Sequence, residues 1–534
     1  MEHNFANLLH RSATWAVRIS FDIYRFRERL IERKDGNKHE RLLKGRKTLC
    51  DDPNFTVLHV QDDGKNDMRL VRPADNPIHH DAIIQKGYHV LSHVWGNIND
   101  YPKWDVSTFI TEVDGQPAKP VPMRPEKRNT LLALLKANPG YWWIDVMCAR
   151  VDTPLVIMGS IYRFCGTCHV MVDCPLDLIA DLKKSRLADF DRELTPLYLD
   201  ASQYNRYHIY SGDLDKDRQA LVKAREDQWK AHKSHKTLIK LHKVINRFHA
   251  EFNCMQKLLD SGWFNRLWTL QEVALPTENV RLLSEQCGGP DNDVIYFDYN
   301  VVDSVSQKIF NVSSSAASSL DPETVNQVIG TSGAHLLLLN EKEKEAGGGG
   351  DQYCKKIGMI SNDRTPAQDY LKCLLVPDHP FKAVCLRAVL SVFANSSRKC
   401  FMPEDYVYGI LGLLSLDIPR MQDPQRVWET FIQKLEDLLI ELSEDERQGL
   451  TYFSLSKKAK TFQLAEAKNM ADVYSGLVVM ELNDWNVYMF DVMEVYQRKK
   501  PDKECPPEYV AGWLIESYET LLPQFKASKT RFYI

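Results

Sequence analysis

The chain has 534 residues, a formal net charge of −4 and 44% hydrophobic residues. It is longer than one compact core usually is, so we expect two or three domains. The composition is typical of a globular chain and not of a disordered one. The near-neutral charge provides no long-range attraction to nucleic acid, so we expect no nucleic-acid partner.

We find no pattern typical of a membrane-spanning helix or a secretory signal in the sequence. No window approaches the roughly 18 apolar residues that a membrane-spanning helix needs. The first residues do not resemble a secretory signal, because arginines such as Arg11 and Arg18 interrupt their apolar positions. We therefore expect a cytoplasmic protein without a stable membrane span, in which the 12 cysteines are mostly reduced core residues.

The first half of the chain alternates strand and helix patterns. We expect residues 1–50 to form an N-terminal helical segment, because apolar residues lie near helical spacing in its first 35 positions. Short apolar runs then predict strands, and two longer patterns predict helices at 128–137 and 155–164. Such alternation predicts an α/β domain over residues 51–300, with a parallel sheet covered by helices. The predicted strands lie at 55–61, 68–72, 88–92, 142–146, 168–172 and 279–283.

A charged helical insertion is expected within this domain, at residues 176–260. Apolar residues alternate by three and four positions between Leu238 and Leu259, which predicts one long amphipathic helix. Residues 263–275 begin a further helix. The polar stretch 301–352, with its glycine run at 347–350, predicts a loop or linker. Residues 353–534 are predicted to be mainly helical, with a late hairpin formed by residues 476–482 and 487–495.

The first candidate site residues follow the strand predicted at 88–92. Ser92, His93, Trp95 and Gly96 lie where that strand ends and the chain turns. Ligands bind beyond the carboxyl ends of strands in open parallel sheets, and a glycine there lets the backbone approach a ligand. A buried tryptophan and a turn glycine would equally explain the pattern.

Asp145 is the candidate that the next strand provides. It falls near the end of the strand predicted at 142–146, where its carboxylate either caps the following loop or belongs to a site. Its position alone favours neither alternative.

A third set of candidates lies on the helix predicted at 263–275. Trp268 and Glu272 are four residues apart and therefore share a face of that helix, while Arg266 lies just before them. A carboxylate beside an indole is partly desolvated, which favours a raised pKa. The same pair could stack a planar base and hold a ribose hydroxyl, although a glutamate near a tryptophan is also common in purely structural helices.

Together these segments resemble the fungal heterokaryon-incompatibility (HET) family, which is related to Toll/interleukin-1 receptor (TIR) domains. The resemblance rests on residues 88–96 (YHVLSHVWG), 142–148 (WWIDVMC) and 263–272 (WFNRLWTLQE). Residues 403–413 (PEDYVYGILGL) also resemble a stretch that often follows HET domains. The resemblance implies a flavodoxin-like core with a central parallel sheet and a role in a self/non-self or cell-death response.

The resemblance also implies a reaction, because several TIR relatives cleave NAD at the nicotinamide–ribose bond. Glu272 would be the catalytic residue, and NAD would be a substrate and not a cofactor. The nucleotide-binding residues implied are Ser92, His93, Trp95, Gly96, Asp145, Arg266, Trp268 and Gln271. A protein partner or self-association is a further expectation.

The second segment departs from the family pattern. Cys148 is followed by Ala149, where the family usually continues with isoleucine, an acidic residue or asparagine, and glutamine. The alternative hypothesis is therefore a non-catalytic signalling module that binds a nucleotide or a protein. The run Cys165–His169 has the C-x-x-C-H spacing of a haem attachment site, but no further metal-ligand pattern accompanies it, so we expect neither haem nor a metal.

Overall fold

A computed structural model of the chain describes most of residues 38–317 and 398–444. The described residues are 38–61, 68–149, 153–204, 234–276, 279–286, 294–317, 367, 371, 386, 389–390, 392–394, 396, 398–444 and 467–473. The chain divides into two compact units, and the larger consists of Lys47–Leu375 together with Cys385–Ile432. It contains the whole sheet and every site residue discussed below.

The core of the larger unit is a sheet of eight strands in the order β4-β2-β1-β5-β3-β6-β7-β8. Four neighbouring strands, β5, β3, β6 and β7, run parallel to one another, whereas β1 and β8 join this block antiparallel. The strands are β1 (Val57–Val60), β2 (Met68–Val71), β3 (His89–His93), β4 (Ile110–Thr111), β5 (Gly140–Ile144), β6 (Thr167–Val172), β7 (Asn279–Ser284) and β8 (Phe297–Asp298).

The central strands form from short apolar runs because helices cover both faces of the sheet. All six residues of β6 are buried, and so are four of the five in β3 and in β5. Continuous burial explains why these strands lack an alternation of polar and apolar residues. The predicted α/β fold is confirmed, and each of the six predicted strands lies within two residues of an observed one.

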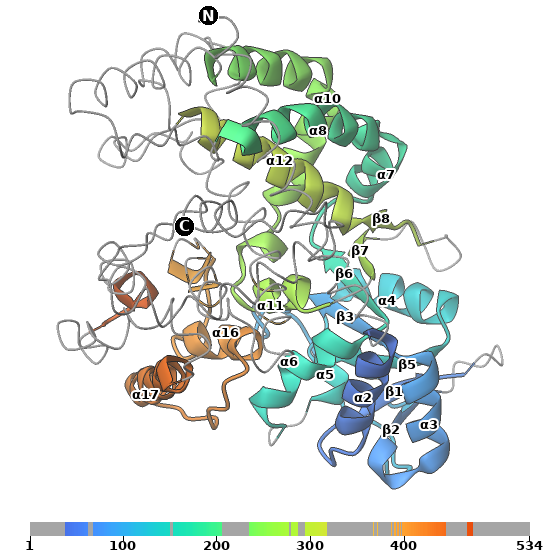
Figure 1. Ribbon diagram of the computed structural model, residues 1–534. Helices are drawn as coiled ribbons and strands as arrows, with labels where there is room; N and C mark the ends of the chain where they lie inside the picture. Colours follow the sequence, from blue (N-terminus) through green and yellow to red (C-terminus); the bar gives the residue numbers. More distant parts are fainter. Residues whose placement is uncertain are drawn as a thin grey trace, which may run out of the picture. The chain divides into compact units, whose positions relative to one another are not determined.

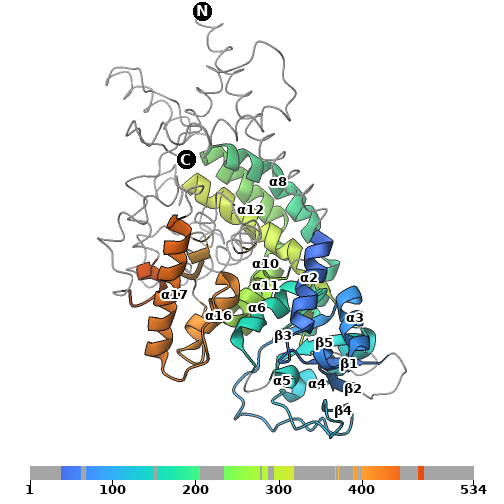
Figure 2. The same ribbon diagram turned by 60° about the horizontal axis from the view of Figure 1, so that its bottom comes forward.

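Helices cover the sheet on opposite faces. On one side, α6 (Leu155–Phe164) packs against α11 (Trp268–Ala274) and α16 (Asp405–Leu414), as Figures 1 and 2 show. On the other side, α4 (Pro125–Ala137) has a proline at its first turn, which suits a helix start. Further helices are α2 (Lys38–Cys50), η2 (Pro73–Asp75), α3 (Pro77–Lys86), α5 (Asp145–Cys148), η3 (Gly262–Asn265) and α17 (Pro424–Glu444).

The predicted helical insertion packs beside the β7 end of the sheet (Figure 1). It comprises α7 (Leu176–Lys184), α8 (Leu187–Tyr204), a helix at 234–247 and α10 (His249–Leu259). Two predictions for this region are wrong. The helix expected to run through 238–259 is interrupted at Phe248, whose ψ is 35°. Residues 301–317, expected in a loop, belong to α12 (Tyr299–Ala317), which packs against α8.

Other predictions lie outside the described residues. These are the hairpin at 476–495, the linker beyond residue 317, and most of the N-terminal segment. The proposed domain boundaries stay predictions. None of the helices that the structure describes has both the length and the hydropathy needed to cross a bilayer. Every cysteine within the described ranges is a free thiol.

Candidate functional site

A polar or charged residue lies at the carboxyl end of each of the four parallel strands. β3 ends at His93, while Asp145 follows β5, Asp173 follows β6 and Glu285 follows β7. Because parallel strands end at one edge, these side chains come together there, where ligands bind in open α/β sheets. We call this set of residues and their partners the carboxyl-edge site.

Ser92 and His93 are consecutive on β3, so they point to opposite faces of the sheet. Ser92 faces α11, and its hydroxyl donates a hydrogen bond to Oε2 of Glu272. The indole Nε1 of Trp263 donates to the same hydroxyl at 2.7 Å. All three side chains are buried, and Glu272 is 8% exposed. The structure thus joins two of the predicted site residues in one buried hydrogen-bonded group.

The carboxyl group of Glu272 has an unusual acidity. Burial raises its pKa to about 7, while the positive charge of Arg266 and the hydrogen bond from Ser92 oppose the rise. This is the direction that the sequence predicts. A carboxyl group with such a pKa is divided between its two protonation states at neutral pH, and can exchange a proton or carry a charge.

His93 lies on the other face of the sheet and is paired with Asp145. Its Nε2 is 3.0 Å from Oδ1 of Asp145, whose Oδ2 accepts a hydrogen bond of 2.6 Å from Nε1 of Trp95. Burial lowers the pKa of His93 despite the nearby carboxylate, so the ring is neutral at pH 7. Burial by itself would raise the pKa of Asp145, but the bonds from His93 and Trp95 outweigh it and lower the value. Asp145 therefore fixes the orientation of both rings.

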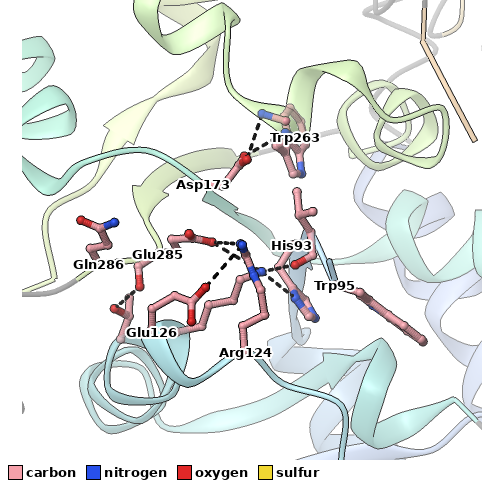
Figure 3. A network of polar contacts seen from close by, with 12 residues as sticks. His93, Trp95, Arg124, Glu126, Asp173, Trp263, Glu285 and Gln286 are labelled. Carbon is pink, nitrogen blue, oxygen red and sulfur yellow. Dashed lines mark hydrogen bonds and ion pairs between the residues drawn. The ribbon is translucent and has the colours of Figure 1, made fainter. Parts of the chain in front are cut away.

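Two basic residues of α4 and its N-cap complete this side of the site (Figure 3). Lys127 is fully buried, lies 3.4 Å from Nδ1 of His93 and donates to the Val94 carbonyl. Its pKa falls to about 8 because burial disfavours the charge and Arg124 repels it. Glu285 lies 3.6 Å from Lys127 and forms an ion pair with Arg124. The single carboxylate of Glu285 is thus the ion-pair partner of both cations at the end of β7.

Gly96 allows the chain to turn closely over Arg124. Its φ of +75° belongs to the left-handed region, which glycine adopts without strain. A Cβ atom at this position would lie 3.0 Å from Cδ of Arg124. Gly96 is exposed and Trp95 is half-buried, so these two predicted residues form the accessible rim of the site.

Three further predicted residues lie on or next to α11. The guanidinium of Arg266 donates to the His93 carbonyl at 3.0 Å, which places it at the end of β3. Trp268 instead donates a hydrogen bond to the carboxyl group of Asp405 on α16. Gln271 is 1% exposed, and its amide has no hydrogen-bond partner among the described residues. The structure therefore groups Arg266 with the site, while Trp268 and Gln271 lie toward α16.

Some polar residues of the site were not predicted from the sequence: Trp263, Asp173, Arg124, Lys127 and Glu285. Asp173 accepts hydrogen bonds of 2.9 Å from the backbone of Gly262 and Trp263 and so anchors η3 beside β6. Asp173 directly follows the strand predicted at 168–172, and Glu285 comes two residues after the strand predicted at 279–283. A position close to the end of a predicted strand is the signal that identified Asp145. Arg124 and Lys127 have no such signal, because their role arises from the way α4 packs on the sheet.

The carboxyl-edge site combines an acid–base group with fixed aromatic and charged groups. Glu272 offers a carboxyl group that is partly ionised at neutral pH, and the Trp95 ring offers a half-exposed stacking face. Within the described part of the chain, no group of three histidine, cysteine, aspartate or glutamate side chains is arranged to hold a metal ion. The residues present suit an organic ligand with hydroxyl groups and a planar ring.

Comparison with known proteins gives one match. The model of the family described as heterokaryon incompatibility protein (HET) matches residues 88–272, a segment that begins just before β3 and ends at Glu272. No curated protein and no solved structure matches the chain significantly. The match includes all three sequence segments that resemble the family. Residues 88–272 of this chain are therefore a HET domain.

Proposed function

We propose that this protein acts in a self/non-self recognition or cell-death response, and that its carboxyl-edge site cleaves NAD or a related nucleotide at the N-glycosidic bond. The proposal rests on the HET-family match. The observation that carries the chemistry is the buried group of Ser92, Trp263 and Glu272 at the end of β3. The raised pKa of this carboxyl group supports a role in acid–base or charge-stabilising chemistry on a sugar.

The ionised form of Glu272 would act in this reaction. As the C1′–N bond breaks, nicotinamide leaves with the bonding electron pair and becomes neutral, and positive charge develops on the ribose. A carboxylate beside C1′ stabilises this oxocarbenium-like state, as in glycoside cleavage. The oxygen of a water molecule then bonds to C1′ and a proton is released. Trp95 would stack against a ring of the nucleotide.

Release of nicotinamide by the purified full-length protein tests this proposal. The variant Glu272→Gln keeps the size of the side chain and an acceptor for Ser92 but cannot ionise. We expect it to lower the rate at least ~100-fold, as loss of a transition-state charge partner usually does. Glu429→Gln is the matched control, because Glu429 is exposed on α17. Equal rates for wild type and Glu272→Gln would contradict the catalytic role.

A second candidate function is a module that binds a nucleotide or a protein partner, or associates with itself, without turnover. The low exposure of Glu272 favours it, since a substrate would have to reach a carboxyl group that is 8% exposed. Ala149, which follows the second family segment in place of the usual residues, favours it as well. A nucleotide that raises the melting temperature but releases no nicotinamide would support this function over the first.

A further inference from the structure

Residues 398–412, called the brace here, contact the HET domain although they follow the matched segment by more than a hundred residues. The amide of Lys399 donates to the Asn265 carbonyl at 2.7 Å, and the Lys399 carbonyl accepts from Leu267 at 2.9 Å. These bonds pair Lys399 with Arg266 as a parallel bridge. They fix the extended backbone between η3 and α11, directly before the helix that carries the candidate catalytic residue.

The side chain of Arg398 adds two hydrogen bonds to this backbone pairing. It is buried, with 7% exposed, and it donates to the Arg266 carbonyl at 3.1 Å and to the Thr269 hydroxyl at 2.5 Å. Thr269 is completely buried, and its hydroxyl lies 2.9 Å from the Trp263 carbonyl. A planar guanidinium with several N–H donors can hold such separate acceptors in one geometry. Arg398 therefore joins η3 to the first turn of α11.

The same contacts continue to the candidate catalytic carboxyl group. Arg398 contacts Thr269, Thr269 contacts Trp263, and the Trp263 indole donates to Ser92, whose hydroxyl donates to Glu272. Burial is the largest influence on the pKa of Glu272 and raises it, while the positive charge of Arg398 acts in the opposite direction. The brace is thus connected to the carboxyl group of Glu272 both by a chain of hydrogen bonds and by the charge of Arg398.

The rest of the brace packs against α11 at close range. Trp268 donates to Asp405 at the start of α16, whose carboxyl pKa is raised by burial despite this bond. About two turns further along α16, a Cβ atom on Gly412 would lie only 2.5 Å from Oε1 of Gln271. The helices can approach this closely only because residue 412 has no side chain.

We propose that the brace is a functional part of the carboxyl-edge site and that Arg398 is a positioning residue for Glu272. Arg398 acts through its neighbours and touches no substrate. The inference depends on the proposed function only where turnover is measured, because the acidity of Glu272 can be measured in the absence of any reaction.

The first experiment compares full-length wild type with Arg398→Gln. The pKa of Glu272 is obtained by pH titration of isotope-labelled glutamate carboxyl groups in NMR spectra, and Glu272→Gln identifies the signal. Loss of the positive charge of Arg398 should raise this pKa, by less than loss of Arg266 would, because Arg398 is the weaker of the two charges that lower it. The control is Arg426→Gln, because Arg426 is exposed on α17 and should leave the titration unchanged.

The kinetic arm follows nicotinamide release against pH. Arg398→Gln should move the pH of half-maximal kcat upward by the same amount as the pKa and lower kcat at pH 7 by roughly tenfold, with a smaller change in KM. If wild type releases no nicotinamide, the proposed reaction fails, while the NMR titration still decides the role of Arg398.

Two further variants keep the test decisive if Arg398→Gln does not fold. Arg398→Lys retains the charge and should keep the pKa of Glu272 close to the wild-type value. Thr269→Val removes the hydroxyl but leaves the charge of Arg398, so it should lower kcat while shifting the pKa less than Arg398→Gln does. Folded Arg398→Gln and Thr269→Val proteins with unchanged pKa and unchanged pH profile would overturn the inference.

Discussion

At the scale of single residues, the fold places ionisable side chains where water reaches them poorly. Glu272, His93 and Lys127 are all buried, and in each of them burial shifts the pKa toward the neutral form. Each has a hydrogen-bond partner that limits the cost of burial: Ser92 for Glu272, Asp145 for His93 and the Val94 carbonyl for Lys127. Buried charges of this kind are expensive unless they are paired, so the arrangement depends on every partner being present.

The raised pKa of Glu272 predicts a pH dependence of stability. The unfolded carboxyl group titrates near pH 4.5 and the folded one near 7, so the folded state retains its proton more tightly. The stabilising contribution is full below pH 4.5 and is lost as the pH rises through about 7, a change of about 3 kcal/mol. Urea unfolding measures the free energy of unfolding at pH 4.5 and at pH 8. Between these values it should fall by about 3 kcal/mol more for wild type than for Glu272→Gln. Parallel curves for the two proteins would contradict the assignment.

The same ionisation predicts the pH dependence of the proposed reaction. Because the carboxylate is the form that stabilises the transition state, nicotinamide release should increase between pH 6 and 8 and reach half of its maximum near pH 7. An initial-rate series with saturating NAD measures this directly. A rate that falls over this range would mean that protonated Glu272, or another group, is the active one.

The burial of Lys127 predicts a third effect, on the stability of the protein. Replacing it with methionine leaves Glu285, whose side chain is 6% exposed, with only Arg124 as its cation. Removing one partner of a buried pair costs about 3–5 kcal/mol when the other charge is left uncompensated. Because Arg124 still pairs with Glu285, we expect a smaller loss of about 1–3 kcal/mol. Chemical denaturation of Lys127→Met should detect a loss of this order, and the double variant with Glu285→Gln should recover part of it. An unchanged midpoint would show that the buried ammonium is unimportant for the fold.

The sequence predicts the part of the site that follows the strands and misses the part that depends on helix packing. Ser92, His93 and Asp145 could be placed because residues at the end of buried parallel strands meet at one edge. The indole that contacts Ser92 is Trp263, although Trp268 has the more suggestive spacing from Glu272. The sequence pattern predicts a helix from residue 263 onward and not the separate turn η3, which brings Trp263 back over β3, so this contact could not be predicted.

At the scale of elements, the crossing of α6 and α16 depends on two glycines. A Cβ atom on Gly159 would lie 2.6 Å from Cα of Gly412, so the helices touch through their backbones. Such close packing holds α16 against α6 without a side chain between the two glycines. Any added methyl group has to move one of the three helices.

This crossing predicts opposite effects for two substitutions at nearby positions of one helix. Gly412→Ala should destabilise the protein by about 1–3 kcal/mol, because overpacking forces backbone shifts. Ser415 is the C-cap of α16 and has a φ of +55°, which glycine adopts more easily. Ser415→Gly should therefore be neutral or stabilising by up to about 1 kcal/mol. Thermal unfolding of the two variants tests the pair, and tolerance of Gly412→Ala would rule out the close crossing.

Elements were predictable where their pattern was simple. The strands could be found because a short apolar run between turns has few other interpretations. The break at Phe248 could not, because apolar residues continue at helical spacing on both sides of it. Helix α12 had a usable signal that its serines obscured: Val302, Val305 and Ile309 are buried and spaced by three and four. There, packing against α8 outweighs the modest helix propensity of serine.

At the scale of the molecule, the larger compact unit extends well past the family match. The match ends at residue 272, whereas the unit includes residues up to 432. If α11 and α16 belong to one cooperative unit, their buried amides should be protected to a similar degree. Hydrogen exchange followed by mass spectrometry should give comparable protection for peptides of α11, α16 and β6. Exchange of α16 that is much faster than that of β6 would mean that the brace opens independently.

The long separation between Arg398 and its partners affects how a newly made chain acquires its site. The carbonyl that Arg398 contacts belongs to a residue 132 positions earlier. At a synthesis rate of about 5–20 residues per second, the ribosome needs roughly 7–26 s to cover that interval. The whole family-matched segment thus leaves the ribosome before its brace exists. A nascent or prematurely terminated chain that ends before Arg398 would contain the whole matched segment, residues 88–272, and still lack the contacts that hold Glu272 in place.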